Sequence, residues 1–161
     1  MPKISKIMDS NTPTLKKEAR VSDAATLMAN NTQGCVVIVE EKKAIGIITE
    51  SDIVRNLVSK KVDSNEKVTE IMSSPPTTIS HNSKLEKANK IIDTKHFRRY
   101  PVIKNGALVG VITENGIVHA INDNIGFHRN VQNAVLIIFV IFEIFIFVLY
   151  RHLVDFLPFL R

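Results

Sequence analysis

The sequence predicts an α/β (α+β) fold made of two tandem β-α-β-β-α repeats, followed by a hydrophobic helix. The first observation is an internal repeat with a constant offset of 64 positions, in which Gly-Ile-Ile-Thr-Glu at residues 46–50 returns as Gly-Val-Ile-Thr-Glu at 110–114. The second is a nearly unbroken apolar run over residues 131–150. Units of under about 60 residues are marginally stable alone and bury their apolar faces against each other. We therefore expect the functional site between the two repeats.

The offset also sets the expected domain boundaries. We assign residues 1–60 to the first repeat, 61–67 to a polar linker and 68–124 to the second repeat. The hydrophobic helix is expected over residues 131–150, and a short tail over 151–161.

In the first repeat, residue patterning predicts strand, helix, strand, strand and helix. Residues 11–15 form a short strand, and residues 36–39 and 44–48 form two buried strands joined across Lys42-Lys43. Ser22 and Asp23 are expected to cap the first helix, because short polar side chains accept hydrogen bonds from free N–H groups at a helix start. Apolar residues recur at helical spacing, at Ala24, Leu27 and Met28 in the first helix and at Ile53, Val54, Leu57 and Val58 in the second.

The second repeat follows the same order. Its strands are expected at residues 100–103 and 107–112. Between them, Asn105-Gly106 predicts a hairpin, because both residues tolerate positive φ. Pro75-Pro76 keeps the entry to the repeat extended. The apolar stripe of its first helix consists of Leu85, Ala88, Ile91 and Ile92.

Composition narrows the functional classes. Residues 1–130 carry a formal charge of +5 and residues 131–161 carry none, so the basic excess belongs to the repeats and suits a solvated surface or attraction to anions, including an anionic membrane face. The single cysteine, Cys35, excludes an internal disulfide and a four-cysteine zinc site, and its apolar neighbours predict a core residue.

The sequence shows none of the common catalytic motifs. No phosphate-binding loop, nucleophile elbow or metal-ligand spacing occurs, and the five histidines are scattered, so we expect no enzyme. His96 is expected at the surface or in packing.

These motifs resemble a pair of CBS domains, also called a Bateman module. The likeness covers roughly residues 1–122 and is carried by Ile-Met at 7–8 and 71–72, by Arg-Arg-Tyr-Pro-Val at 98–102 and by the closing runs at 46–52 and 110–116. Proteins of this family pack two sheets into a pseudo-symmetric unit with two clefts, which commonly bind AMP, ADP, ATP or S-adenosylmethionine. They usually form flat dimers and sense a ligand without transforming it. The resemblance therefore implies a regulatory homodimer that binds an adenosine nucleotide.

The resemblance implies a nucleotide site, and an adenine ring needs a flat apolar slot, which the strands around Val37 and Ile47 are expected to supply. The Asp52 carboxylate suits the ribose hydroxyls, and Thr49 lies at a helix start, where free N–H groups favour phosphate. Thr49 and Asp52 also match a capping box, which alone explains both residues, and the two roles can coexist at Thr49. The complete expected set is Thr14, Val37, Ile47, Thr49, Asp52, Arg98, Arg99 and Thr113.

The two clefts differ in the residues that carry this chemistry. Thr113 matches Thr49, but Gly116 stands where the first repeat has Asp52. Conversely, Arg98-Arg99 stands where the first repeat has Gly34-Cys35. We expect one nucleotide cleft centred on Asp52, with Arg98 reaching across as the phosphate partner. The alternative for Arg98-Arg99 is a solvated basic pair.

The run at residues 131–150 predicts a membrane anchor, because twenty helical residues span about 30 Å, the thickness of a hydrocarbon core. Its fifteen Val, Leu, Ile and Phe residues favour insertion by roughly 4 to 9 kcal/mol, against about 3 kcal/mol for Glu143. We expect a single-pass helix that holds the repeats at the cytoplasmic face of a membrane. A helix buried in a cytoplasmic soluble oligomer is the alternative. Glu143 is expected to mark a helix–helix contact or a membrane-protein partner.

The sequence thus favours a membrane-tethered regulatory module that binds an adenosine nucleotide. The alternative is a ligand-free dimerising scaffold or interaction protein whose hydrophobic tail mediates oligomerisation. Nucleic acid is not an expected partner, because the repeats have little aromatic interleaving and no localised basic stripe.

Overall fold

The computed structural model describes residues 2–59, 61–95 and 97–156, with side chains for all of these except residues 123–129 and 152–156. The chain forms two compact units, Met1–Ala120 and Ile121–Arg161. His96, the side chains of His128 and His152, and the last part of the expected tail lie outside the described residues.

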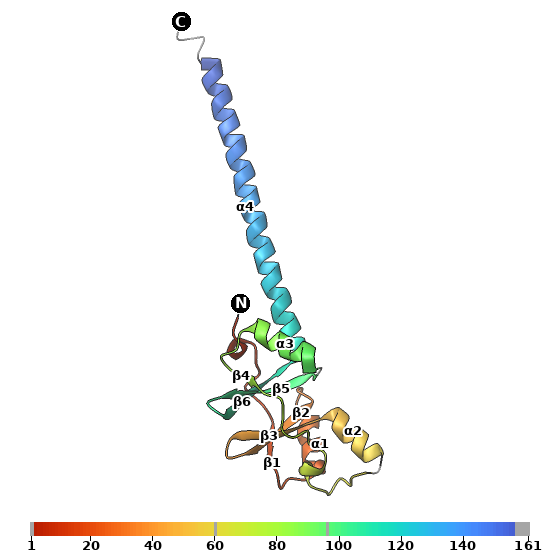
Figure 1. Cartoon of the computed structure of the whole chain (residues 1–161). Helices are drawn as coiled ribbons and strands as arrows, with labels where there is room; N and C mark the ends of the chain where they lie inside the picture. The colour runs from red at the N-terminus through yellow and green to blue at the C-terminus, as the bar shows by residue number, and fades with distance from the viewer. Residues whose placement is uncertain (1, 60, 96, 157–161) are drawn as a thin grey trace. The chain divides into compact units, whose positions relative to one another are not determined.

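The first repeat is a three-stranded sheet with two helices (Figure 1). Its strands are β1 (Thr14–Lys16), β2 (Cys35–Glu40) and β3 (Lys43–Thr49), in the order β1-β2-β3. β1 pairs parallel with β2, and β2 pairs antiparallel with β3. The helices are α1 (Val21–Ala29), which connects the two parallel strands, and α2 (Glu50–Val58), which follows β3 directly.

The second repeat has the same topology. Its strands are β4 (Ile79–Ser80), β5 (Arg99–Lys104) and β6 (Ala107–Thr113), in the order β4-β5-β6. Helix α3 (Leu85–Lys95) connects β4 and β5, and α4 (Glu114–Phe156) follows β6. A short 3-10 helix precedes each repeat's first strand, at Ile4–Lys6 and Val68–Glu70. The predicted α+β repeat architecture is therefore confirmed.

Both hairpins turn through residues with positive φ. Asn105 and Gly106 have φ values of 52° and 81°, so the predicted hairpin is present. In the first repeat the turn residues are Glu41 and Lys42, with φ values of 47° and 68°, one position earlier than the expected Lys42-Lys43. Two consecutive positive φ values match the right-handed twist of the flanking strands, which explains why even Glu and Lys adopt them here.

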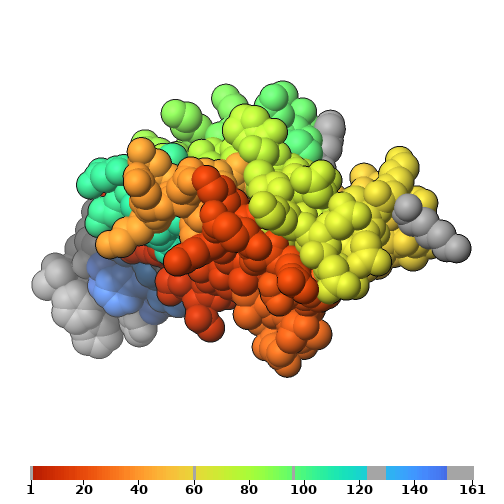
Figure 2. All heavy atoms as spheres, turned by 90° about the horizontal axis from the view of Figure 1, so that it is seen from below, coloured from red at the N-terminus to blue at the C-terminus, as the bar shows by residue number. Residues whose placement is uncertain are grey.

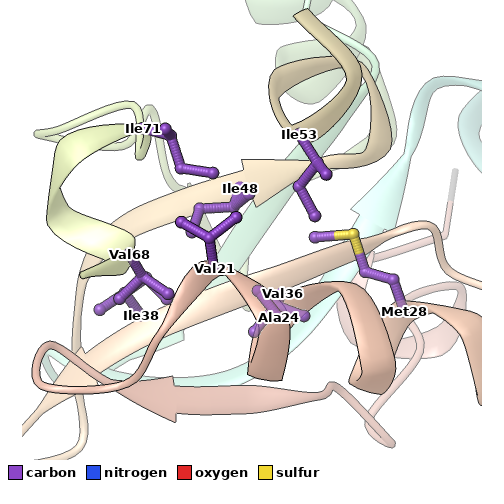
Figure 3. Packing of buried hydrophobic residues seen from close by; sticks show 9 residues of the cluster. All are labelled: Val21, Ala24, Met28, Val36, Ile38, Ile48, Ile53, Val68 and Ile71. Atoms are coloured by element: carbon purple, nitrogen blue, oxygen red, sulfur yellow. The ribbon is translucent and has the colours of Figure 1, made fainter. Parts of the chain in front are cut away.

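The first repeat buries an apolar cluster between its helices and its sheet. Ile48 and Ile53 pack with residues from α1 and from the segment that leads to the second repeat (Figure 3). The members of this cluster are Val21, Ala24, Met28, Val36, Ile38, Ile48, Ile53, Val68 and Ile71.

The polar segment between the repeats is tied to the first repeat by backbone hydrogen bonds. The Val21 N–H donates to the Glu66 carbonyl at 2.9 Å, and the Val68 N–H donates to the Ala19 carbonyl at 2.9 Å. In Figure 2 the red N-terminal residues and the yellow-green residues at the start of the second repeat lie side by side. Val68 and Ile71, which follow this segment, therefore complete the first repeat's core.

Two details of the expected helices are wrong. Helix α1 begins at Val21, so the cap position falls on Arg20, and Asp23 accepts a hydrogen bond from the Arg20 N–H at 2.8 Å from within the first turn. On α2, Val54 and Val58 are 60% and 76% exposed, although periodicity placed them on a buried face. The sheet beneath this short helix covers only one narrow stripe of it.

The two repeats join through crossed pairings and a shared core. Asp9, ahead of the first repeat's sheet, pairs with Val111 of β6, and the equivalent Ser73 pairs with Ile47 of β3. A second apolar cluster contains Cys35, Val37 and Ile47 from the first repeat and Val111 from the second. Each repeat therefore supplies backbone partners to the other, which fixes their relative position in the first unit.

The second unit contains the apolar part of α4. Its segment Asn130–Arg151 comprises 22 residues with a mean hydropathy of 2.6, and none of its most apolar stretch is buried. By length and composition this helix is able to cross a membrane.

Candidate functional site

A cavity of about 500 Å³ in the first unit is lined by residues from both repeats. Ile47, Thr49 and Asp52 come from the end of β3 and the start of α2, while Arg98 and Arg99 come from the start of the second hairpin. These five are members of the predicted set, so the structure brings the acid of one repeat to the bases of the other. The remaining lining residues are Ser51, Arg55, Ser73, Pro75, Pro76, Thr77 and Phe97.

Hydrogen bonds at the start of α2 hold Asp52 in the cavity wall. The Thr49 N–H and the Thr49 hydroxyl both donate to Asp52 Oδ2, at 2.9 and 2.7 Å, and the Asp52 N–H donates to Thr49 Oγ1 at 3.4 Å. This is the capping box that the sequence predicts. All of these bonds use Oδ2, and within the described part of the chain no hydrogen bond reaches Oδ1. Capping therefore orients the carboxylate and leaves one oxygen for a ligand.

The cavity wall carries more positive than negative charge. Arg55, Arg98 and Arg99 face a single carboxylate, that of Asp52. The only ion pair among the described residues joins Lys17 to Glu40, outside this wall, so the three guanidinium groups are not neutralised by salt bridges there. A cavity of this charge favours a ligand that carries phosphate.

Two lining residues were not predicted from the sequence. Arg55 follows Asp52 by three residues on α2, and this spacing places both on one helix face, which is the signal that could have identified it. Phe97, immediately before Arg98-Arg99, is 50% exposed and packs edge-on against Tyr100, with ring centroids 6.3 Å apart. The Phe97 N–H also donates to the Tyr100 hydroxyl at 3.1 Å. Phe97 gives the cavity a fixed aromatic surface.

Arg99 crosses from the second repeat to the first. Its Nε–H donates to the carbonyl oxygen of Gln33. Gly34 has a φ of +58°, and a Cβ there would lie 2.5 Å from Arg99 Nη2 and 2.8 Å from Glu50 Oε2. The positive φ favours glycine at position 34, and a side chain there would force the guanidinium group to shift.

Three members of the predicted set lie elsewhere. The Val37 side chain is fully buried in the cluster shared by the repeats and does not line the cavity. Thr14 is exposed on β1 and does not line the cavity. Thr113 lines a different cavity. The first strand and the centre of β2 thus contribute packing, while the strand ends contribute the cavity wall.

The second cavity, of about 510 Å³, borders the start of α4. It shares Arg98 and Arg99 with the first cavity, and its other lining residues are Thr32, Gln33, Thr113, Glu114 and Asn115. The Gly116 N–H donates to Thr113 Oγ1 at 3.0 Å, so half of a capping box is present. No carboxylate stands at the position equivalent to Asp52.

Burial raises the pKa of two groups near these cavities. The pKa of the Cys35 thiol rises to about 11, because burial disfavours the thiolate more than the nearby Arg99 favours it. The pKa of Tyr100 is also raised, chiefly by burial. Both groups are therefore protonated at neutral pH. No cluster of three or more His, Cys, Asp or Glu side chains that could hold a metal ion occurs within residues 2–59, 61–95 and 97–156 where side chains are described.

Comparison with known proteins gives consistent matches. An uncharacterised protein of Methanocaldococcus jannaschii is 29% identical over 127 residues, which cover 78% of this chain and 45% of that protein. This chain thus spans less than half the length of that relative. A CBS domain protein from Pyrobaculum aerophilum, solved in complex with AMP, superimposes with a TM-score of 0.66 at 25% identity, covering 71% of this chain and 89% of the other.

A hexameric CBS-CP12 protein from bloom-forming cyanobacteria matches with a TM-score of 0.66 at 27% identity, over 73% of this chain and 70% of the other. The sequence profile of the CBS domain itself matches twice, at residues 4–59 and 68–123. These two segments coincide with the two repeats whose crossed pairing builds the cavities. The chain therefore belongs to the CBS-domain family and carries a CBS pair, a regulatory ligand-binding module.

Proposed function

We propose that this protein is a regulatory module that binds an adenosine nucleotide in the first cavity. The observation that carries the proposal is the meeting of Thr49 and Asp52 from one repeat with Arg98 and Arg99 from the other in one cavity of about 500 Å³. That volume suits a small-molecule ligand. The AMP complex of the Pyrobaculum aerophilum CBS protein supports an adenosine ligand.

The ribose, the phosphate and the base of a nucleotide each find a chemically suitable group in the cavity wall. The free oxygen of Asp52 is placed to accept a hydrogen bond from a ribose hydroxyl. The guanidinium groups of Arg98 and Arg99, with Arg55 beside them, suit the phosphate, since Arg binds phosphate through paired donors. The Phe97 ring offers a flat surface for the adenine base.

The charges of the cavity wall also discriminate among the candidate ligands. S-adenosylmethionine brings a sulfonium cation into a wall with three guanidinium groups, which repel it. AMP, ADP and ATP bring anionic phosphates, which these groups attract. We therefore rank the phosphate-bearing nucleotides above S-adenosylmethionine.

The proposed output is a change in the relation between the repeats rather than a chemical reaction. A nucleotide that contacts Asp52 and Arg98 together stabilises the arrangement in which both contacts are made. It can shift the equilibrium only by the difference in its affinity for the two arrangements. The residues that line the cavity do not identify the protein that receives this signal.

We further propose that segment Asn130–Arg151 of α4 tethers the module to a membrane, with the CBS pair on the cytoplasmic side, where nucleotides are found. Its length and mean hydropathy of 2.6 support this placement. Glu143 is the one acidic residue inside the segment, and an acid in lipid usually marks a helix–helix contact. Replacing Glu143 with Leu tests this, because unchanged oligomeric state and unchanged recovery of partners would contradict it.

The nucleotide proposal is tested by thermal melting of the full chain in detergent with AMP, ADP, ATP or S-adenosylmethionine. A ligand at about 100 times its Kd adds roughly 2.7 kcal/mol to the free energy of unfolding, which raises Tm by several degrees. Asp52→Ala should remove this shift. Asp52→Asn serves as the matched control for folding, because its amide oxygen can still cap α2. A chain whose Tm responds to none of these ligands would contradict the proposal.

The tether is tested by alkaline carbonate extraction of membranes from cells that express the chain. We expect the unmodified protein to stay with the lipid pellet. Ile141→Arg adds about 3 kcal/mol to the cost of insertion and should shift the protein toward the soluble fraction. Ile141→Leu is the matched control. Extraction of the unmodified chain would favour an oligomer that buries the helix.

A ligand-free scaffold is the second candidate, and the exposed side chains of α2 favour it. Val54 and Val58 are 60% and 76% exposed and offer an apolar surface for another copy. The hexameric state named for the cyanobacterial CBS-CP12 protein shows that a related protein self-associates. Val58→Asp should dissociate such an assembly, measured by light scattering, whether or not nucleotide is present.

A further inference from the structure

Two cavities of the first unit share the same pair of guanidinium groups. Arg98 and Arg99 line the cavity that contains Asp52, and they also line the cavity that contains Thr113. Arg98 is exposed, so its side chain is free to turn toward either cavity. Arg99 is half-buried and anchored through its Nε–H to the Gln33 carbonyl, and it lines both cavities from that position.

The second cavity has the chemistry of a phosphate site without that of a nucleoside site. Hydroxyl and amide groups of Thr32, Thr113 and Asn115 line this cavity together with the two arginines. Gln33 also lines it, and its buried Oε1 has no hydrogen-bond partner among the described residues. The position equivalent to Asp52 is Gly116, which offers no acceptor to a ribose. The position equivalent to Phe97 is Gln33, which offers no ring to a base.

One acidic group also lines this cavity, the exposed carboxylate of Glu114. The Glu50 carboxylate stands beside Arg99 at Gly34, outside the lining. Among the lining groups two guanidinium groups outweigh the single carboxylate, and the first N–H groups of α4 add partial positive charge at the same end. The balance of charge therefore still favours an anion.

We propose that the second cavity binds a phosphate group that carries no base there, and that this anion and the nucleotide of the first cavity weaken each other's binding. The antagonism rests on the proposed nucleotide function, whereas the anion site stands on the second cavity alone. Each phosphate needs Arg98 and Arg99, and two phosphates on one pair of side chains lie within about a Debye length, roughly 8 Å, where repulsion is poorly screened. Linkage makes the effect reciprocal.

The experiment measures AMP binding to the full chain in detergent by calorimetry, in sodium chloride and in sodium phosphate of equal ionic strength, with pyrophosphate as a second probe. We expect the apparent Kd for AMP to rise at least about 5-fold in phosphate. We also expect one AMP per chain. An unchanged Kd, or two AMP molecules per chain, would overturn the proposal.

A matched pair of variants separates the two cavities. Ser51 lines only the first and its equivalent, Asn115, lines only the second. Asn115→Asp places a negative charge in the second cavity and should abolish the effect of phosphate on AMP binding. Ser51→Asp should abolish AMP binding and leave the rise in Tm that phosphate causes. If phosphate weakens AMP equally in Asn115→Asp, the two compete directly in the first cavity and the proposal is wrong.

The same variants identify the source of the phosphate. If the second cavity holds the terminal phosphates of a nucleotide bound in the first, Asn115→Asp lowers the affinity for ATP more than that for AMP, and the proposed antagonism is wrong. If it holds free phosphate, the ratio of the two affinities is unchanged. Should no nucleotide bind the unmodified chain, the proposed nucleotide function fails, but the anion site is still tested. Phosphate must then raise Tm in the unmodified chain and not in Asn115→Asp, and the absence of that rise would overturn it.

Discussion

The guanidinium group of Arg99 lies against Gly34 of the first CBS domain, in space that a side chain at position 34 would occupy. Its terminal nitrogen Nη2 lies 2.5 Å from the point where a Cβ at Gly34 would stand, and its Nε–H donates to the neighbouring Gln33 carbonyl. The residue equivalent to Gly34 in the second domain is Arg98, which lines both cavities. One domain therefore carries the cations, and the other leaves the space that admits them.

This relationship predicts a large cost for Gly34→Ala. The residue has a φ of +58°, so any Cβ costs roughly 1–2 kcal/mol from backbone strain, and the contact with Arg99 adds to it. Gly106 is the matched control, because its φ is +81° and a Cβ there meets nothing within 4 Å. Denaturant unfolding should show a greater loss for Gly34→Ala than for Gly106→Ala. Equal losses would mean that the guanidinium moves aside without cost.

The incomplete cap of α4 predicts a stabilising substitution. Thr113 accepts a hydrogen bond from the Gly116 N–H, as Thr49 does from Asp52, but Gly116 returns none. A Cβ at position 116 would lie 3.2 Å from Thr113 Oγ1, so that hydroxyl must move slightly. With that shift, Gly116→Asp would complete the capping box and remove a helical glycine, for a gain of about 1 kcal/mol. Thermal melting should show a Tm higher by several degrees. Gly116→Ala controls for the loss of glycine alone, and a gain no larger than that of Gly116→Ala would show that no cap forms.

The charge of the first cavity predicts that Arg55 contributes to nucleotide affinity. Arg55→Gln removes one of three guanidinium groups, and a hydrogen bond to a charged group is worth about 1.5–3 kcal/mol when its partner is also buried. Because Arg55 is exposed, we expect a smaller effect, of about 3- to 10-fold in Kd. The equivalent residue, His119, lines neither cavity, so His119→Gln should leave Kd unchanged. An Arg55→Gln chain that binds AMP as well as the unmodified one would exclude this role.

The buried thiol of Cys35 predicts how stability depends on alkaline pH. Burial raises its pKa from 9.0 to about 11 in the folded chain. Between these values the unfolded chain loses the thiol proton and the folded chain keeps it. The free energy of unfolding should therefore fall as the pH rises from about 9 to 11.

Substituting Cys35 with Ala should flatten this part of the pH profile, which urea titrations at fixed pH values can measure. The unmodified chain should also resist iodoacetamide at neutral pH until it is unfolded, because the thiol is both buried and protonated. Rapid alkylation of the folded chain would show that Cys35 is accessible.

Much of the fold follows from local pattern. The repeat of 64 positions specifies two equal domains, and Asn105-Gly106 specifies a hairpin, because few other pairs adopt two positive φ values. The capping box of Thr49 and Asp52 also follows from spacing along one helix turn. The helical, apolar character of residues 131–150 follows from their composition, although α4 itself runs unbroken from Glu114 to Phe156. Each of these features depends on residues that are close in the sequence.

Other features depend on contacts between distant parts of the chain. Periodicity placed Val54 and Val58 with Ile53, but how much of a helix is covered depends on the sheet beneath it. The alternation of apolar and polar residues along the strands did not distinguish Val37 from Ile47. Val37 is buried against the neighbouring domain, whereas Ile47 lines the cavity. Phe97 joined Asp52 in one cavity wall only when the two domains were brought together.

The sequence by itself determined the two CBS domains, their strands and helices, the acid in one and the bases in the other, and an apolar helix beyond them. Only the tertiary structure decided that these charges meet. The crossed pairing of Asp9 with Val111 and of Ser73 with Ile47 sets one domain against the other. That arrangement carries Arg98 and Arg99 to the wall that holds Asp52, and no local pattern encodes it, because it arises from backbone hydrogen bonds between residues more than 25 positions apart.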